Sequence, residues 1–135
     1  MDAGTKAIHV PATPLSDSSM LMMTSNLLIK GRTPNWACHW IGQTNWKVRI
    51  LGSAALECVQ VAAGVAHGAV TVNGKLWDVA APAAILLEAG GRITDLQGGE
   101  IFPFDLRQYV GAKVPFLAAG PAAHPVLLEE IRNNP

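Results

Sequence analysis

The sequence predicts a layered α/β domain, with a mixed, mostly parallel sheet of about five strands and helices on both faces. Short apolar segments typical of buried strands alternate with segments whose apolar residues recur at the 3.6-residue spacing of a helix. Half of the residues are hydrophobic and only 15% are charged, which indicates a folded chain rather than a disordered one. The length of 135 residues predicts a single domain over residues 1–135.

The first third of the chain is expected to contribute two strands and a short helix. One strand is predicted over Lys6–Pro11 and a second over Ser19–Ser25, an apolar run whose methionines would also suit a helix. The segment Leu27–Trp46 is irregular, but Trp36 and Trp40 lie one helical turn apart and favour a short helix there.

The middle of the chain reads as strand, helix and strand. After a strand over Val48–Leu51, a helix is predicted over Ser53–Ala63, where Gly64 ends it. A strand over Ala66–Val72 follows, and Asn73-Gly74 indicates a turn.

The last part contains two helices and two strands. Asp78 is the expected N-cap of a helix over Val79–Ala89, with Pro82 in its first turn. The remaining predicted elements are strands over Arg92–Leu96 and Pro115–Ala119 and a final helix over Pro125–Ile131.

Charge and cysteine content argue against several classes of protein. Ten basic and ten acidic residues cancel, so neither a nucleic-acid-binding face nor an acidic tail is indicated. Cys38 and Cys58 show no metal-ligand spacing and are expected to be reduced thiols. No apolar run is long enough for a membrane helix and the first residues are not of signal-peptide type, so the cytoplasm is the expected location.

The segment 49–103 carries a set of motifs in fixed order. It contains R-x-L-G-S-A-A, V-A-A-G, W-D-V-A-A and E-A-G-G, followed by a strand and a D-x-x-G turn. This set resembles the C-terminal domain of the inositol monophosphatase family. The resemblance continues more weakly to the end of the chain and fits the first 45 residues only loosely.

The resemblance implies Mg²⁺-dependent hydrolysis of a small phosphorylated metabolite. Asp78 matches an aspartate that binds one catalytic Mg²⁺ and touches the substrate hydroxyls, although an aspartate at a helix start also has a purely structural reading. Gly52, Ser53 and Ala54 match the backbone segment that lines the sugar or polyol pocket. Thr71 departs from the glutamate that animal inositol enzymes place there, which weakens inositol phosphate as the substrate.

Two other residues of these motifs are interpreted as structural. Glu88 follows two leucines near a helix end, and Trp77 is expected to be a packing residue.

Cys38 and His39 as zinc ligands would need two further ligands. The aromatic group Trp36, Trp40 and Trp46 is expected to serve packing or an interface rather than base stacking, because few cations flank it.

The family also supplies most metal ligands from an N-terminal domain with a D-P-x-D-G-T turn. The sequence has no Asp-Pro and no Asp-Gly step. The chain is therefore expected to be a truncated or excised part of such an enzyme, inactive alone. The alternative is a stand-alone binding or oligomerisation module that keeps the fold. Family members are commonly dimers, so a homo-oligomer is expected in either case.

Overall fold

The computed structural model describes residues 7–135, which form five strands, four α-helices and one short 3₁₀ helix, η1. The strands are β1 Met20–Met23, β2 Lys47–Arg49, β3 Gly68–Thr71, β4 Arg92–Thr94 and β5 Phe116–Ala119. The helices are α1 Asn35–Gly42, α2 Ala54–Ala62, α3 Leu76–Glu88, η1 Leu106–Gln108 and α4 His124–Asn133.

The strands form one mixed sheet in the order β2-β1-β3-β5-β4. β1 pairs in parallel with both β2 and β3, whereas β5 runs antiparallel to its neighbours β3 and β4. Four strands therefore share one direction and only β5 opposes them. This arrangement confirms the predicted mostly parallel sheet.

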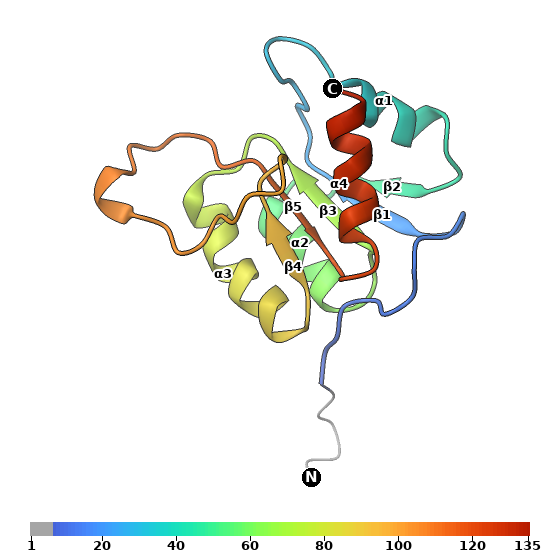
Figure 1. Ribbon diagram of the computed structural model, residues 1–135, viewed down its shortest axis with the longest axis horizontal. Coiled ribbons are helices and arrows are strands. Elements are labelled where there is room, and N and C mark those ends of the chain that lie inside the picture. Colours follow the sequence, from blue (N-terminus) through green and yellow to red (C-terminus); the bar gives the residue numbers. More distant parts are fainter. Residues whose placement is uncertain (1–6) are drawn as a thin grey trace.

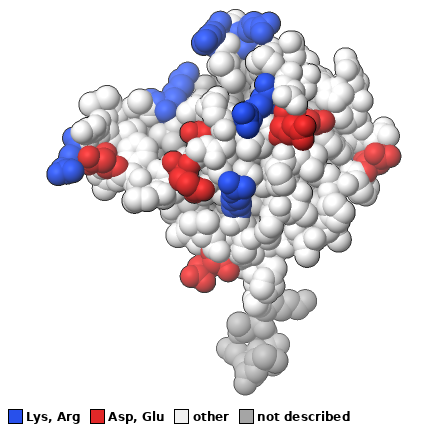
Figure 2. Space-filling model, in the orientation of Figure 1, with Lys and Arg blue, Asp and Glu red and all other residues white. Residues whose placement is uncertain are grey.

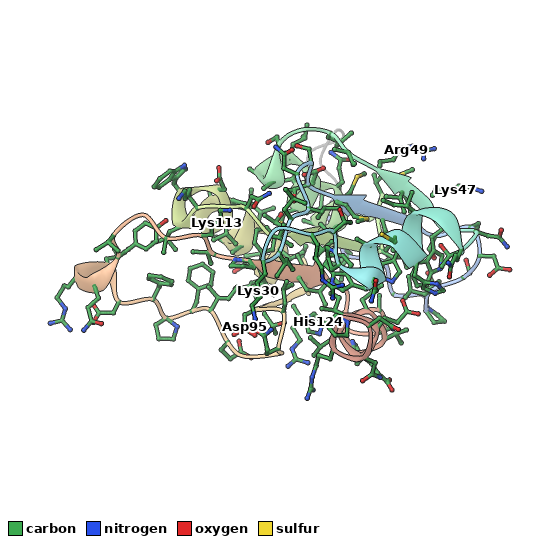
Figure 3. The ribbon with its side chains drawn as sticks, turned by 90° about the horizontal axis from the view of Figure 1, so that it is seen from above. Lys30, Lys47, Arg49, Asp95, Lys113 and His124 are labelled. Carbon is green, nitrogen blue, oxygen red and sulfur yellow. The ribbon has the colours of Figure 1, made fainter. Side chains whose placement is uncertain are left out.

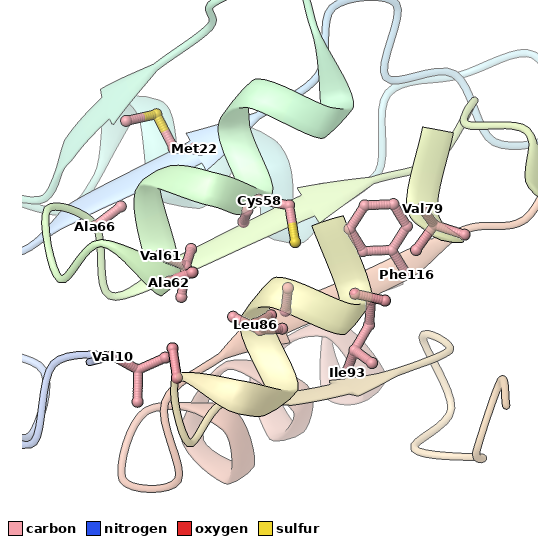
Figure 4. Close-up of a cluster of buried hydrophobic side chains, with 14 of the residues drawn as sticks. Val10, Met22, Cys58, Val61, Ala62, Ala66, Val79, Leu86, Ile93 and Phe116 are labelled. Carbon is pink, nitrogen blue, oxygen red and sulfur yellow. The ribbon is translucent and has the colours of Figure 1, made fainter. Parts of the chain in front are cut away.

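Helices cover both faces of the sheet (Figure 1). Successive strand residues point to opposite faces, so Leu117 packs on the face of α1 and α4, and Phe116 on the face of α2 and α3. The α2–α3 side is a dense cluster of small and branched side chains (Figure 4). Its labelled members are Val10, Met22, Cys58, Val61, Ala62, Ala66, Val79, Leu86, Ile93 and Phe116.

The opposite layer explains the tryptophan-rich segment. Trp36 and Trp40 on α1 are each 1% exposed, and their ring centroids lie 4.9 Å apart. The Trp46 ring meets Trp40 edge-on at 5.8 Å. This confirms the predicted short helix and the packing role of the aromatic group.

Two sequence predictions about local structure are wrong. Residues 7–11 of the predicted strand Lys6–Pro11 form no strand (Lys6 lies outside the described residues). The Val10 N–H instead donates to the Ala89 carbonyl at the end of α3, at 3.0 Å. Pro82 lies inside α3 rather than in its first turn, and having no N–H it cannot donate to the carbonyl of Asp78.

The two cysteines lie in different layers. Cys38 is exposed on α1 and Cys58 is buried on the sheet-facing side of α2, and both are free thiols, as expected. Within residues 7–135, no helix combines the length and apolar character needed to cross a membrane.

Candidate functional site

A cavity of about 320 Å³ opens where β1 and β3 end and where α2 and α3 begin. All five residues that the sequence predicts as site residues line it: Gly52, Ser53, Ala54, Thr71 and Asp78. The carboxyl ends of parallel strands are where open α/β sheets bind ligands, so the location suits a binding site. The cavity is also lined by residues that the sequence reasoning missed: Thr24, Ser25, Asn26, Asn73 and Gly74.

The start of α2 forms one wall. Gly52 has a φ of +82°, and a Cβ there would meet no atom within 4 Å, so glycine is favoured by its backbone conformation rather than by lack of space. Ser53 is the N-cap, and its side-chain oxygen accepts the N–H of Leu56 at 3.2 Å. The segment 52–54 that lines the cavity therefore has a well-defined backbone.

The buried carboxylate of Glu57 stabilises the backbone of this wall. Its side chain is 1% exposed, and Oε2 accepts the Leu51 N–H at 2.9 Å. Burial raises the pKa of the Glu57 carboxyl, and the hydrogen bond from Leu51 partly opposes that rise. Glu57 thus fixes the residue that precedes Gly52, although it does not line the cavity itself.

Asp78 is the third residue of α3, not its N-cap as the sequence predicted. The N-cap is Lys75, whose backbone N–H donates to Asp78 Oδ2 at 2.8 Å. The helix begins earlier than predicted because its first turn includes Leu76 and Trp77. The capping contact uses only one of the two carboxylate oxygens, so the other can serve a ligand.

The end of β3 is joined to the end of β1. Thr71 is 1% exposed and lies in the ladder between β3 and β5. Two residues later, the side-chain amide of Asn73 donates to the carbonyls of Ser25, at 3.4 Å, and Asn26. The missed residues are the last two of the predicted strand Ser19–Ser25 and the residues that directly follow this strand and the predicted strand Ala66–Val72. Their position at the carboxyl ends of strands was the signal that could have identified them.

A loop from 101 to 115 braces the start of α3. The Tyr109 hydroxyl accepts the Leu76 N–H at 3.0 Å and donates to the Ala112 carbonyl at 2.9 Å. The Val114 N–H donates to the Gly74 carbonyl at 2.6 Å. Trp77 was expected to be a packing residue. Its ring meets Tyr109 edge-on, with the ring centroids 6.4 Å apart, but 66% of the residue is exposed, so it does not belong to the core.

Of the Asp, Glu, Lys, Arg and His side chains in the part of the chain that the structure describes, Asp78 alone lines the cavity. Among residues 7–135, no group of three or more His, Cys, Asp or Glu side chains could hold a metal ion. A protein Mg²⁺ site takes octahedral oxygen coordination, and one carboxylate supplies only part of it. The described residues therefore do not fit a complete Mg²⁺ site.

Comparison with known proteins explains the motif pattern. The model of the inositol monophosphatase family matches residues 8–135. The inositol-1-monophosphatase ImpA of Mycolicibacterium smegmatis is 30% identical over 124 residues, covering 89% of this chain and 42% of ImpA. A fructose-1,6-bisphosphatase/inositol-1-monophosphatase of Thermotoga maritima is 47% identical over 58 residues, which are 43% of this chain and 23% of that protein.

Structural comparison agrees with these matches. The inositol monophosphatase of Anabaena (Nostoc) sp. PCC 7120 superposes with a TM-score of 0.75 and 26% identity, covering 95% of this chain and 50% of that one. The chain thus spans about half the length of the relatives it matches. The chain belongs to the inositol monophosphatase family.

Proposed function

We propose that this chain is the C-terminal domain of a Mg²⁺-dependent phosphomonoesterase acting on a small sugar or polyol phosphate. One observation carries the proposal. The five residues that the family resemblance identifies as site residues all line one cavity, at the carboxyl ends of β1 and β3. The names of the matched relatives, an inositol-1-monophosphatase and a fructose-1,6-bisphosphatase/inositol-1-monophosphatase, agree with that substrate class.

In this proposal Asp78 supplies one oxygen ligand to Mg²⁺ and contacts substrate hydroxyls. Bound Mg²⁺ would neutralise phosphoryl charge and activate water. The remaining ligands would come from outside residues 7–135, because those residues offer no second carboxylate at the cavity. The chain alone is therefore proposed to be inactive.

The other polar residues of the cavity favour the neutral, hydroxylated part of such a substrate. Ser25 and Asn73 carry hydroxyl and amide groups, which pair with sugar or polyol hydroxyls, and the nearly buried Thr71 also lines the cavity. No Lys, Arg or His within residues 7–135 lines the cavity, so these residues offer the phosphate no positively charged partner there. We propose that the cavity holds the polyol part and that the phosphate is held by groups supplied from elsewhere.

The outer surface of α2 and α3 favours a second candidate, a non-catalytic binding or oligomerisation module. A surface helix normally presents polar residues to solvent. Here the exposed fractions are 47% for Leu56, 42% for Ile85 and 52% for Leu87. Such a face suits either the remainder of a longer enzyme or a homo-oligomer contact. A cytoplasmic location is proposed for both candidates.

The proposal is tested by supplying the missing ligands. The chain is fused behind the N-terminal half of the M. smegmatis relative and assayed with Mg²⁺ against sugar and inositol phosphates. Turnover should appear in the fusion, fall by about a hundredfold or more in Asp78→Asn, and persist in Glu88→Gln, an exposed carboxylate on the same helix. Equal turnover in the Asp78→Asn fusion would remove Asp78 from the site.

A second experiment uses the isolated chain. Calorimetric titration with Mg²⁺ should show no saturable binding at or below about millimolar concentration, since one carboxylate with solvent is a poor site. Repurified chain should show no phosphatase activity that depends on Asp78. Activity that survives repurification and disappears in Asp78→Asn would contradict the proposed inactivity of the isolated chain.

A further inference from the structure

A second cavity, of about 440 Å³, lies on the other side of the sheet from α2 and α3, between the segment 29–34 and the C-terminal end of α4. Three cationic side chains line it: Lys30, Arg32 and Arg132. Among the described residues, no Asp or Glu side chain lines it, and the apolar residues Ile29, Leu96 and Ile131 contribute part of its wall. None of these residues lines the candidate site described above.

No side-chain ion pair among the described residues neutralises the positive charge of this region. Across residues 7–135, the single salt bridge joins Arg107 and Asp105, at 3.1 Å. The Arg32 guanidinium donates to the main-chain oxygen of Pro135, the last residue of the sequence given, which also lines the cavity. The distance between these two atoms is 3.4 Å. Figure 2 shows Lys and Arg side chains gathered at the top of the molecule, where residues 26–34 pass the end of α4 in Figure 1.

A tight turn positions two of the three cations. Ile29 and Arg32 form an antiparallel bridge, with backbone hydrogen bonds of 2.9 and 3.2 Å between them. The two residues at its tip, Lys30 and Gly31, have φ values of +52° and +80°. Such turns favour asparagine or glycine, so a lysine at the first position carries a conformational cost. Backbone outliers of this kind cluster where function requires them.

We infer that this cavity binds a small phosphate monoester with an apolar body. Its volume lies within the range of small-molecule sites, about 300–1,000 Å³. A phosphate carries about two negative charges, which three cations balance, and guanidinium groups match its oxygens in a bidentate manner. The aliphatic side chains of Ile29, Leu96 and Ile131 give the non-phosphate part of the ester an apolar contact.

The test is calorimetric titration of the full chain with phenyl phosphate and with inorganic phosphate, in phosphate-free buffer at low ionic strength. Binding should be saturable with one site per chain, and phenyl phosphate should bind about threefold tighter because it also uses the apolar wall. Lys30→Asn and Arg132→Gln should each weaken binding by about tenfold. Lys30→Asn is chosen because asparagine tolerates a positive φ and so preserves the turn.

Matched controls separate this site from general charge effects and from the candidate active site. Lys47→Gln removes one positive charge from β2, well apart from Lys30 (Figure 3), and should leave affinity unchanged. Asp78→Asn should also leave it unchanged, so a failure here and a failure of the proposed phosphatase are distinguishable. Amide NMR shifts on titration should localise to residues 29–34, 96–97 and 131–132.

Three results would overturn the inference. They are the absence of saturation up to about 10 mM phenyl phosphate, an equal loss of affinity in Lys47→Gln, and NMR shifts centred on Gly52–Ala54 instead. Equal affinity for the two probes would overturn the assignment of the apolar wall. The unfolding midpoint of each variant, measured in urea, excludes loss of the fold as the cause of lost binding.

Discussion

Lowering the pH below 6.5 is expected to destabilise the fold through one buried histidine, His124. This residue begins α4, has 0% exposure, and its Nε2 lies 2.9 Å from the Thr94 hydroxyl. Because that hydroxyl donates its own proton to the Asp95 carbonyl at 2.8 Å, it can only accept from His124. We therefore assign the proton of the neutral imidazole to Nε2. The buried Nδ1 has no hydrogen-bond partner among the described residues.

Charging this imidazole would add a buried N–H at Nδ1 with nothing to accept it. Burial, reinforced by the positive charge of Arg92, lowers the pKa of His124 from 6.5 to about 4. The unfolded chain therefore binds a proton near pH 6.5 while the folded chain does not. The contribution of neutral His124 to the stability of the fold is complete above pH 6.5 and is lost as the pH falls toward 4. At about 1.4 kcal/mol per pKa unit, the loss approaches about 3 kcal/mol.

Urea unfolding measured between pH 7.5 and 4 for the wild type and for His124→Gln would check this prediction. The variant should be less stable at neutral pH, but the gap between the two proteins should narrow by about 3 kcal/mol as the pH falls. Comparing the two proteins cancels the contribution of Glu57, whose raised pKa has the opposite sign and gives stability that is lost as the pH rises. Arg92→Gln should reduce the pH dependence modestly, since Arg92 is the secondary cause. A gap that stays constant across the range would refute the argument.

Three further perturbations follow from buried contacts. Trp40→Phe removes the indole N–H donated to Glu130 and should cost about 2 kcal/mol by urea unfolding, a loss smaller in a Glu130→Gln background. Gly64→Ala should cost about 1–2 kcal/mol, because φ is +81° and the new Cβ would lie 2.9 Å from the His9 carbonyl oxygen; Gly42→Ala, which meets no atom within 4 Å, is the control. Ellman's reagent should titrate one thiol in the native chain and two in urea, because Cys38 is exposed whereas burial raises the pKa of Cys58 to about 12. Rapid reaction of both native thiols would contradict that burial.

The order of helices and strands was predictable because most segments show a clear hydrophobic period or a residue that ends a helix or forms a turn. Gly64 lies just beyond α2 with a left-handed φ, as the helix-stop signal requires. The predicted strand was wrong for residues 7–11 because apolar content alone does not make a strand. A strand needs a neighbouring strand, and Pro11 has no N–H for a ladder, so Val10 bonds the end of α3 instead. The insertion of antiparallel β5 between β3 and β4 follows from packing that no local pattern encodes.

The candidate site was only partly predictable, because its residues carry two kinds of signal. Gly52–Ala54 and Asp78 lie in dense motifs and were found from the resemblance. Ser25 and Asn73 lie in no motif, and become neighbours only because parallel β1 and β3 end at the same edge of the sheet. The position of Asp78 at the third residue of α3 likewise depends on where Lys75 leaves the extended conformation, which the W-D-V-A-A motif does not specify.

The distribution of charge gives the two cavities opposite preferences. Counting side chains of residues 7–135, Asp78 is the only Asp, Glu, Lys, Arg or His at the first cavity, whereas the second is lined by three cations and no Asp or Glu. An oxyanion placed alone in the first cavity would face a carboxylate, which costs free energy unless a cation lies between them. It would meet only positive side-chain charge in the second. Free phosphate should therefore prefer the Lys30–Arg132 cavity in this chain. It should bind beside the Asp78 cavity only when Mg²⁺ and its further ligands are supplied.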